Sequence, residues 1–150
     1  MSTLLIVHHT PSPATRDLLE AVLAGTRDPE ITGVDVVVRP ALAATATDML
    51  EADGYMFGTP ANFGYMSGAL KHFFDTVYYP VLDYVANRPY GLWVHGNNDT
   101  ASAVSAVERI ATGLSLVRSA DVLEVTEVVD GAVRHKAYEL GGTLAALLME

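Results

Sequence analysis

Short apolar runs alternate with segments of helical periodicity along the whole chain, and this alternation limits the possible folds most strongly. The expected strands are Thr3–His8, Val34–Arg39, Gly54–Phe57, Tyr90–His95 and a less sharply bounded strand within Val117–Val125. Strands that alternate with helices form a parallel sheet with helices on both faces. The sequence therefore predicts an α/β fold with a doubly wound, five-stranded parallel sheet, in one domain spanning residues 1–150.

Between these strands, apolar side chains recur every three or four residues, as in amphipathic helices. The expected helices lie around Leu18–Leu23, Ala41–Ala52, Ala69–Val77, Ala103–Ala111 and Tyr138–Met149. Ligands of doubly wound sheets bind beyond the carboxyl ends of the strands, where the strand order reverses. The segments of interest are therefore loop 1 (His8–Thr15), loop 3 (Gly58–Ser67) and loop 4 (His95–Thr100).

Composition excludes several classes of protein. The chain has 150 residues, half of them hydrophobic, with a formal net charge of -9 and no cysteine. The acidity argues against a nucleic-acid partner, and the lack of cysteine excludes disulfides, thiolate metal sites and cysteine catalysis. No apolar segment is long enough to cross a membrane, and the N-terminus does not read as a signal peptide. We therefore expect no membrane insertion and a cytoplasmic location.

Loop 1 lies within the stretch "VHHTPSPAT", residues 7–15. Ser12 followed by Pro13 is typical of a helix cap and a first helical position. Three hydroxyls, on Thr10, Ser12 and Thr15, together with free N–H groups of the helix start would suit a phosphate monoester. An ordinary capped helix also accounts for Ser12 and Pro13, so both interpretations stay open. His8 and His9 point to opposite faces of a continued strand, and no shared metal ion is expected.

Loop 3 opens the most informative stretch, "GTPANFGYMSGALKHFFD", residues 58–75. Its glycines permit unusual backbone shapes and close approach. Phe63, Tyr65 and Met66 place large side chains on a loop, where a flat aromatic ligand would explain their exposure. The alternative is that these side chains fold back under neighbouring loops.

This stretch resembles the second flavin-binding loop of flavodoxin-like FMN proteins, and most closely that of the NAD(P)H-dependent FMN reductases and NAD(P)H:quinone oxidoreductases. The matching elements are Gly58-Thr59-Pro60, Phe63-Gly64-Tyr65-Met66-Ser67 and Leu70-Lys71-His72-Phe73-Phe74-Asp75. The segment from Thr10 to Thr15 is similar to the flavodoxin phosphate loop, Thr-x-Thr-Gly-x-Thr, with Pro13 in place of glycine. The resemblance implies a flavodoxin-like fold with strand order 2-1-3-4-5.

The resemblance also implies which residues would hold FMN. The phosphate would be bound by Thr10, Ser12, Ala14 and Thr15, with Thr59 close to the ribityl chain. The isoalloxazine ring would be bordered by Pro60, Ala61, Asn62, Phe63 and Gly64, and its pyrimidine end by His95, Gly96, Asn97 and Asn98. Pro13 removes one N–H donor and should weaken phosphate binding.

Neighbouring residues receive roles from the same reasoning. Tyr65 and Met66 would lie near the ring edge or a second subunit, whereas Lys71, Phe73 and Asp75 would be structural. Asp99 with Thr100 would cap the following helix, and Trp93 would pack in the core. Tyr78, Tyr79 and Tyr84 would form a homodimer face or pack under the returning chain.

The implied function is an FMN oxidoreductase that passes electrons from NAD(P)H to a quinone or similar acceptor. The flavin carries the chemistry, so no catalytic side chain is required, and His95 is a candidate proton donor as well as a candidate backbone-bonded histidine. The alternative is a flavodoxin-type carrier that exchanges electrons with a redox protein, which the short chain and its acidity favour. A phosphoacceptor domain of the same topology would need acidic residues where His8 and His9 stand.

Overall fold

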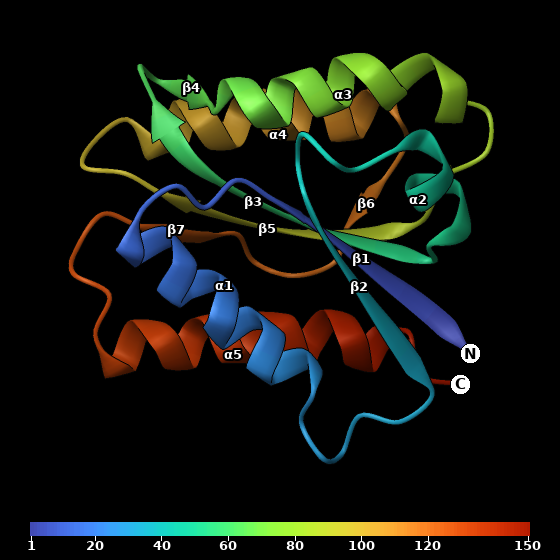
Figure 1. Ribbon diagram of the computed structural model, residues 1–150, viewed down its shortest axis with the longest axis horizontal. Coiled ribbons are helices and arrows are strands. Elements are labelled where there is room, and N and C mark those ends of the chain that lie inside the picture. The colour runs from blue at the N-terminus through green and yellow to red at the C-terminus, as the bar shows by residue number, and fades with distance from the viewer.

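One twisted sheet lies between two helical layers in the computed structural model, which describes residues 1–150 (Figure 1). The strands are β1 (Ser2–His8), β2 (Val34–Pro40), β3 (Gly54–Asn62), β4 (Tyr65–Met66), β5 (Pro89–His95), β6 (Val117–Arg118) and β7 (Leu123–Val125). The helices are α1 (Pro13–Thr26), α2 (Ala46–Glu51), α3 (Gly68–Val81), α4 (Thr100–Gly113) and α5 (Gly131–Leu147). Helices α2, α3 and α4 cover one face of the sheet, and α1 and α5 cover the other.

The order of the parallel strands is β2-β1-β3-β5-β6, and β7 also pairs with β5. This order confirms the predicted doubly wound sheet, with β5 as its fourth strand and β6 and β7 together as its fifth. The chain moves from β1 to one side for β2 and to the other side for β3. The strand order therefore reverses at the carboxyl ends of β1 and β3, which is where such sheets bind ligands.

Both faces of the central strands are buried, which explains why their sequences are continuous apolar runs. Leu5 and Val7 of β1 belong to the core under α2, α3 and α4, whereas Leu4 and Ile6 belong to the core under α1 and α5. All four side chains are fully buried. A strand that is covered on both faces has no polar side to display, so its sequence shows no alternation of apolar and polar residues.

The fifth strand and the β3 region differ from the expected boundaries. Between the paired residues Arg118 and Leu123 the chain takes five steps, while the facing stretch of β5 from Tyr90 to Trp93 takes three. The extra residues bulge out and divide the strand into β6 and β7, which an edge strand tolerates. Strand β3 continues to Asn62, beyond the predicted end at Phe57, because residues 58–60 still pair with β5 and the last two residues pair antiparallel with β4.

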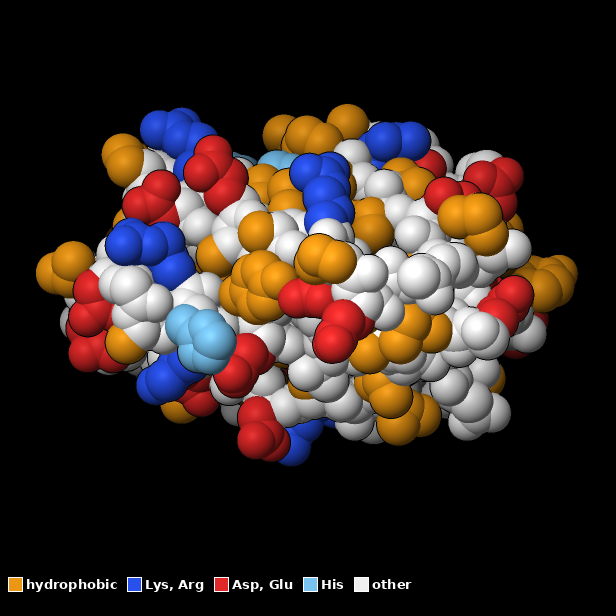
Figure 2. Space-filling view, turned by 90° about the horizontal axis from the view of Figure 1, so that it is seen from below, with side chains coloured by type: hydrophobic (Ala, Val, Ile, Leu, Met, Phe, Trp, Pro, Cys, Tyr) orange, Lys and Arg blue, Asp and Glu red, His pale blue; other side chains and the backbone are white.

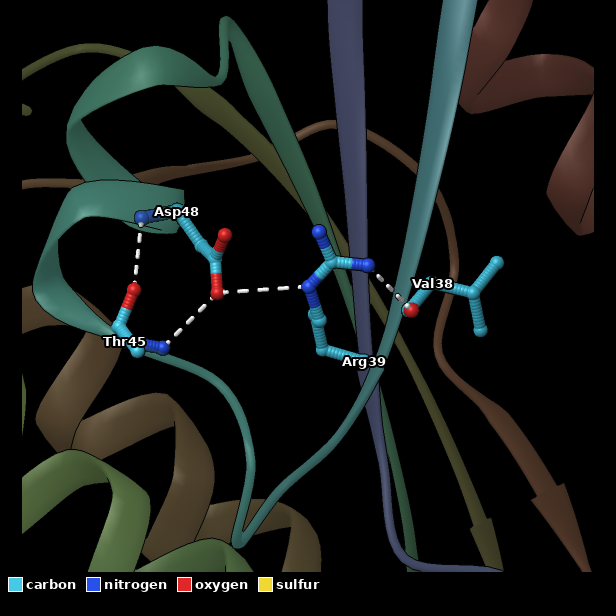
Figure 3. Close-up of polar contacts among 4 residues, drawn as sticks. All are labelled: Val38, Arg39, Thr45 and Asp48. Atoms are coloured by element: carbon cyan, nitrogen blue, oxygen red, sulfur yellow. Dashed lines mark hydrogen bonds and ion pairs between the residues drawn. The ribbon is translucent and has the colours of Figure 1, made fainter.

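The expected helix at Ala41–Ala52 is wrong in its first half, since α2 begins only at Ala46. Thr45 and Asp48 explain the start: the Thr45 hydroxyl accepts the Asp48 N–H at 3.1 Å, and the Asp48 carboxylate accepts the Thr45 N–H at 3.0 Å. The same carboxylate lies 3.6 Å from the Arg39 guanidinium at the end of β2 (Figure 3). This capping box fixes the helix start and ties it to the sheet.

Helices α4 and α5 begin before their expected starts, whereas α1 begins at the predicted Pro13. Helix α5 begins at Gly131, where the Asp130 carboxylate accepts the Val133 N–H at 2.9 Å, and not at Tyr138. Helix α4 likewise spans Thr100–Gly113, and so extends beyond Ala103–Ala111 at both ends. The Asp130 cap thus explains the early start of α5, whereas α4 has no side-chain cap.

Helices α1 and α5 contact each other backbone to backbone. A Cβ atom built on Gly25 of α1 would lie 1.9 Å from the Tyr138 carbonyl oxygen, and one built on Gly141 of α5 would lie 2.0 Å from the Val22 carbonyl oxygen. Only glycine fits at either position. Figure 2, which views the molecule from this side, shows acidic and basic side chains interspersed among apolar ones over the two helices.

The crossing predicts opposite effects for two adjacent glycines. Gly141→Ala should lower the free energy of unfolding by about 3 kcal/mol, because the added methyl group meets a backbone carbonyl that cannot move without separating the helices. Gly142→Ala is the matched control: its Cβ would lie 3.4 Å from the nearest atom, an ordinary contact. That variant should gain up to about 1 kcal/mol of helix propensity. Urea unfolding measures both, and equal effects would contradict the crossing geometry.

Candidate functional site

Loops 1, 3 and 4 meet at the carboxyl ends of β1, β3 and β5, at the left of Figure 1. The His9 N–H donates to the Gly58 carbonyl at 3.0 Å, which joins loop 1 to β3. A Cβ built on Gly96 would lie 2.9 Å from the Ala61 Cβ, so loop 4 lies directly against the end of β3. The end of β3 therefore lies next to both loop 1 and loop 4.

In loop 1, Ser12 and Thr15 form a reciprocal capping box. The Ser12 hydroxyl accepts the Thr15 N–H at 3.2 Å, and the Thr15 hydroxyl accepts the Ser12 N–H at 3.0 Å. Pro13 occupies the first helical position, as predicted. The Thr10 hydroxyl lies 3.0 Å from Nδ1 of His8. Capping therefore accounts for Thr15 as well as Ser12, a signal that the Ser-x-x-Thr spacing carried and that the sequence reasoning missed.

The two histidines of loop 1 have different surroundings. His8 follows the alternation of Leu4 and Ile6, so its side chain projects on the α1/α5 face of the sheet. Burial lowers the pKa of His8, and the neighbouring His9 lowers it further. Nδ1 of His9 is buried without a hydrogen-bond partner. Such an unpaired nitrogen is available to a polar ligand atom at the start of loop 1. No group of three or more His, Asp or Glu side chains is placed to share a metal ion.

Loop 3 is a β-hairpin rather than an irregular loop. Strands β3 and β4 pair antiparallel, with Asn62 opposite Tyr65, so Phe63 and Gly64 form a two-residue turn. Both have positive φ, 52° and 71°, as a type I′ turn requires. The left-handed region costs a residue with a Cβ about 1–2 kcal/mol. The relative exposure of Phe63 is 108%, so this large aromatic side chain is fully exposed to solvent while its backbone is strained.

The hairpin is held from beneath by Thr59. Its hydroxyl accepts the Ser67 N–H at 2.9 Å and donates to the Pro60 carbonyl at 2.8 Å, and the side chain is buried. Thr59 thus shapes the loop in this structure and does not present its hydroxyl at the surface. The expected place of Met66 near a ring edge is wrong, because the hairpin register turns Met66 into the core under α3 and α4.

Residues behind the hairpin have the expected structural roles. Lys71 and Asp75 form an ion pair at 2.6 Å on α3, and Phe73 is buried. Trp93 is buried in the core, also as expected. A Cβ built on Gly58 would lie 2.0 Å from the Trp93 ring, so the indole lies against the β3 backbone immediately before the hairpin. The sequence did not predict this contact, in which the Trp93 ring packs against the end of β3.

Loop 4 carries His95, Asn97 and Asn98. His95 is paired in register with Pro60, and partial burial lowers the pKa of its imidazole. The two asparagines are exposed. Because Trp93 packs on the α1/α5 face, the alternation along β5 places His95 on that face too. His8 and His95 therefore stand on either side of β3.

Asp99 does not cap α4 as expected. It stands at the N-cap position with a left-handed backbone, φ 54°, and its side chain makes no hydrogen bond to the helix backbone. Its carboxylate accepts the Ser102 hydroxyl at 2.6 Å instead. A Cβ built on Gly64 would lie 2.5 Å from Asp99 Oδ2, so the hairpin tip rests against this carboxylate. Asp99 thus joins loop 3 to loop 4.

The structure gathers the predicted site residues in two groups. Those expected at a flavin ring, from Pro60 to Gly64 and from His95 to Asn98, lie in adjoining loops. Those expected at the phosphate lie between the end of β1 and the first turn of α1, where their hydroxyls already have protein partners. A separate groove of about 540 Å³ lies beside the hairpin between Tyr65 and α4 and contains Lys71 and Arg109. No helix combines the length and apolarity needed to cross a membrane.

Several solved structures share this fold. A flavodoxin from the domain Archaea aligns with a TM-score of 0.82 at 15% identity, over 97% of this chain and 98% of that one. A flavodoxin, WrbA-like protein of Agrobacterium tumefaciens aligns with a TM-score of 0.79 at 16% identity, over 99% and 98% of the two chains. The rubredoxin oxygen:oxidoreductase of Desulfovibrio gigas gives 0.83 at 14% identity, over 99% of this chain and 36% of that one.

Sequence comparison gives the family. A flavodoxin of Aquifex aeolicus is 36% identical over 77 residues, which are 51% of this chain and 40% of that protein. The model of the family described as NADPH-dependent FMN reductase matches residues 15–127, from the start of α1 to beyond β7. That match includes loops 3 and 4 and most of the sheet. The chain therefore belongs to the NADPH-dependent FMN reductase family.

Proposed function

We propose that this protein is an FMN-binding oxidoreductase that takes electrons from NADH or NADPH and passes them to a quinone or a similar small acceptor. The observation that carries the proposal is the bare, strained Phe63 at the tip of the β3–β4 hairpin, next to the polar groups of loop 4. Backbone strain of this kind persists where function requires it. Membership of the FMN reductase family supports the same ligand.

The residues at the strand ends fit the ring of FMN. Phe63 and the hairpin backbone offer a flat apolar surface, and Asn97 and Asn98 offer exposed amide groups for the polar pyrimidine edge. The unpaired His9 Nδ1 lies at the beginning of loop 1, where the flavin side chain would pass. Bound FMN would supply the hydride acceptance and electron release, and the protein would orient the ring and limit its contact with water.

His8 and His95 bring polar but uncharged groups to this edge. Burial is the main cause of the lowered pKa of both imidazoles, so both stay neutral at neutral pH. Neutral imidazoles can donate or accept hydrogen bonds without placing a cation beside the ring. His95, on the loop expected to border the pyrimidine end, is the better placed of the two to hold a proton near it.

A second candidate function is electron carriage between protein partners. It is favoured by the Aquifex aeolicus flavodoxin and by the net charge of -9, which would steer a basic redox partner toward the protein. Tyr79 and Tyr84 are exposed, whereas Tyr78 packs over Gly113 of α4. Tyr79 and Tyr84 are therefore the part of the proposed homodimer surface that stays open to a second protein.

An anaerobic titration tests the main proposal. The protein should quench the fluorescence of added FMN. NADH or NADPH should then bleach the flavin absorbance near 450 nm at a rate at least about tenfold higher than that of free FMN, which corresponds to a barrier lower by ~1.4 kcal/mol. Addition of a quinone should restore the absorbance. If dithionite reduces the bound flavin but neither NADH nor NADPH does, the carrier function is favoured. Failure to quench FMN would contradict both functions.

Phe63→Asn should separate stability from binding. The substitution creates an Asn-Gly turn, which is preferred at positive φ, and should raise the free energy of unfolding by about 1 kcal/mol. Loss of the aromatic surface should weaken FMN roughly tenfold. Tyr84→Asn, which removes another exposed aromatic ring, is the matched control and should leave FMN affinity unchanged. Thermal unfolding and fluorescence quenching measure the two effects. A variant that is less stable and binds FMN as well as the native chain would refute the role of Phe63.

The histidines predict a pH dependence of stability. Their folded pKa values lie below the unfolded value of about 6.5, so the unfolded chain takes up protons first as the pH falls. Stability should therefore decrease between about pH 7 and about pH 5, on top of any carboxylate contribution. The double variant His8→Gln, His95→Gln should lose less stability over this range than the native chain. Parallel stability curves for the two proteins would show that neither histidine is held neutral.

A further inference from the structure

We infer that the site recognises the flavin ring and not the phosphate, so that riboflavin and FMN are bound with similar affinity. The inference rests on the proposed flavin binding and concerns which flavins the site accepts. A phosphate-selective loop needs free N–H donors, free hydroxyls and a nearby positive charge. Loop 1 and the first turn of α1 are deficient in each of the three.

Backbone donors are few in loop 1. Pro11 and Pro13 have no N–H group. The Ser12 N–H donates to the Thr15 hydroxyl at 3.0 Å, and the Thr15 N–H donates to the Ser12 hydroxyl at 3.2 Å. The N–H groups of Thr10 and Ala14 remain. A phosphate would therefore find two free backbone N–H donors. A loop without the prolines and without this capping box would offer more.

The hydroxyls of loop 1 are also engaged. Those of Ser12 and Thr15 lie 2.9 Å apart, and the Thr15 hydroxyl lies 3.0 Å from the Ser12 carbonyl oxygen. The third hydroxyl, on Thr10, is 3.0 Å from His8 Nδ1. Thr15 is almost fully buried. The Ser12 hydroxyl could donate to a phosphate while it still accepts the Thr15 N–H, but the Thr15 hydroxyl is buried and donates to the Ser12 carbonyl. Loop 1 therefore offers fewer free hydroxyl donors than its three hydroxyl residues suggest.

Countercharge is scarce at this corner. Arg16 is the single Lys or Arg among residues 1–26, it is exposed, and Asp17 follows it directly. Arg39 lies at the end of the neighbouring β2, but its guanidinium pairs with Asp48 of α2 at 3.6 Å (Figure 3). Helix α1 covers the other face of the sheet. The formal net charge of the whole chain is -9. Side-chain charges at loop 1 therefore do little to favour a phosphate dianion.

The ring end of the site, in contrast, keeps its apolar and amide groups free. Phe63 is bare, Asn97 and Asn98 are exposed, and loops 3 and 4 hold each other through Gly64 and Asp99. These free groups are the ones that would contact the isoalloxazine.

The test is a pair of dissociation constants measured on the full chain by fluorescence quenching, one for FMN and one for riboflavin. The two should differ by less than about tenfold, or ~1.4 kcal/mol. Inorganic phosphate at millimolar concentration should not compete with FMN. A preference for FMN of about tenfold or more would overturn the inference. FMN binding without riboflavin binding overturns this inference alone, whereas binding of neither flavin overturns the proposed function as well.

Variants of loop 1 sharpen the test. Pro11→Gly with Pro13→Gly restores two N–H donors and should tighten FMN while leaving riboflavin unchanged, so riboflavin serves as the control for an intact ring site. Arg16→Ala should leave the ratio of the two constants unchanged. If Arg16→Ala weakens FMN but not riboflavin, the phosphate is held by that guanidinium and the inference is wrong.

Discussion

Burial of β1, β3 and β5 on both faces is the constraint on which the rest of the structure depends. Strands covered by helices on both sides leave polar chemistry only at their ends, and the carboxyl ends are where loops 1, 3 and 4 meet. The backbone contact between α1 and α5 at Gly25 and Gly141 fixes the position of α1 and hence of loop 1. The site is thus a consequence of how the layers pack.

At this edge the two ends of the site are built differently. The proposed ring end displays exposed groups, above all Phe63 on its strained backbone. The phosphate end has paired its own groups, since Ser12 and Thr15 satisfy each other. The hairpin keeps its strain and loop 1 has completed its hydrogen bonds. We therefore infer that the ring, and not the phosphate, selects the ligand.

Much of this was predictable from local sequence. Continuous apolar runs such as Leu4–Val7 predicted a parallel sheet, and the stretch from Gly58 to Asp75 predicted the family. Features that depend on reciprocal contacts were not predictable. The capping box of Thr45 and Asp48 shortened α2, and the register of the β3–β4 hairpin buried Met66. Asp99 had the right residue type for a cap, yet its left-handed backbone directed the carboxylate to Ser102 instead.

The central claim is that a flavin ring binds at the carboxyl ends of β3 and β5, between the hairpin and loop 4. Mapping of backbone amide chemical shifts by NMR on addition of FMN tests it most directly, since each loop has amides of its own. The account predicts the largest shifts at residues 61–65 and 95–99, with smaller ones at residues 9–15. Shifts confined to the groove between Tyr65 and α4, or the absence of shifts in loops 3 and 4, would contradict it.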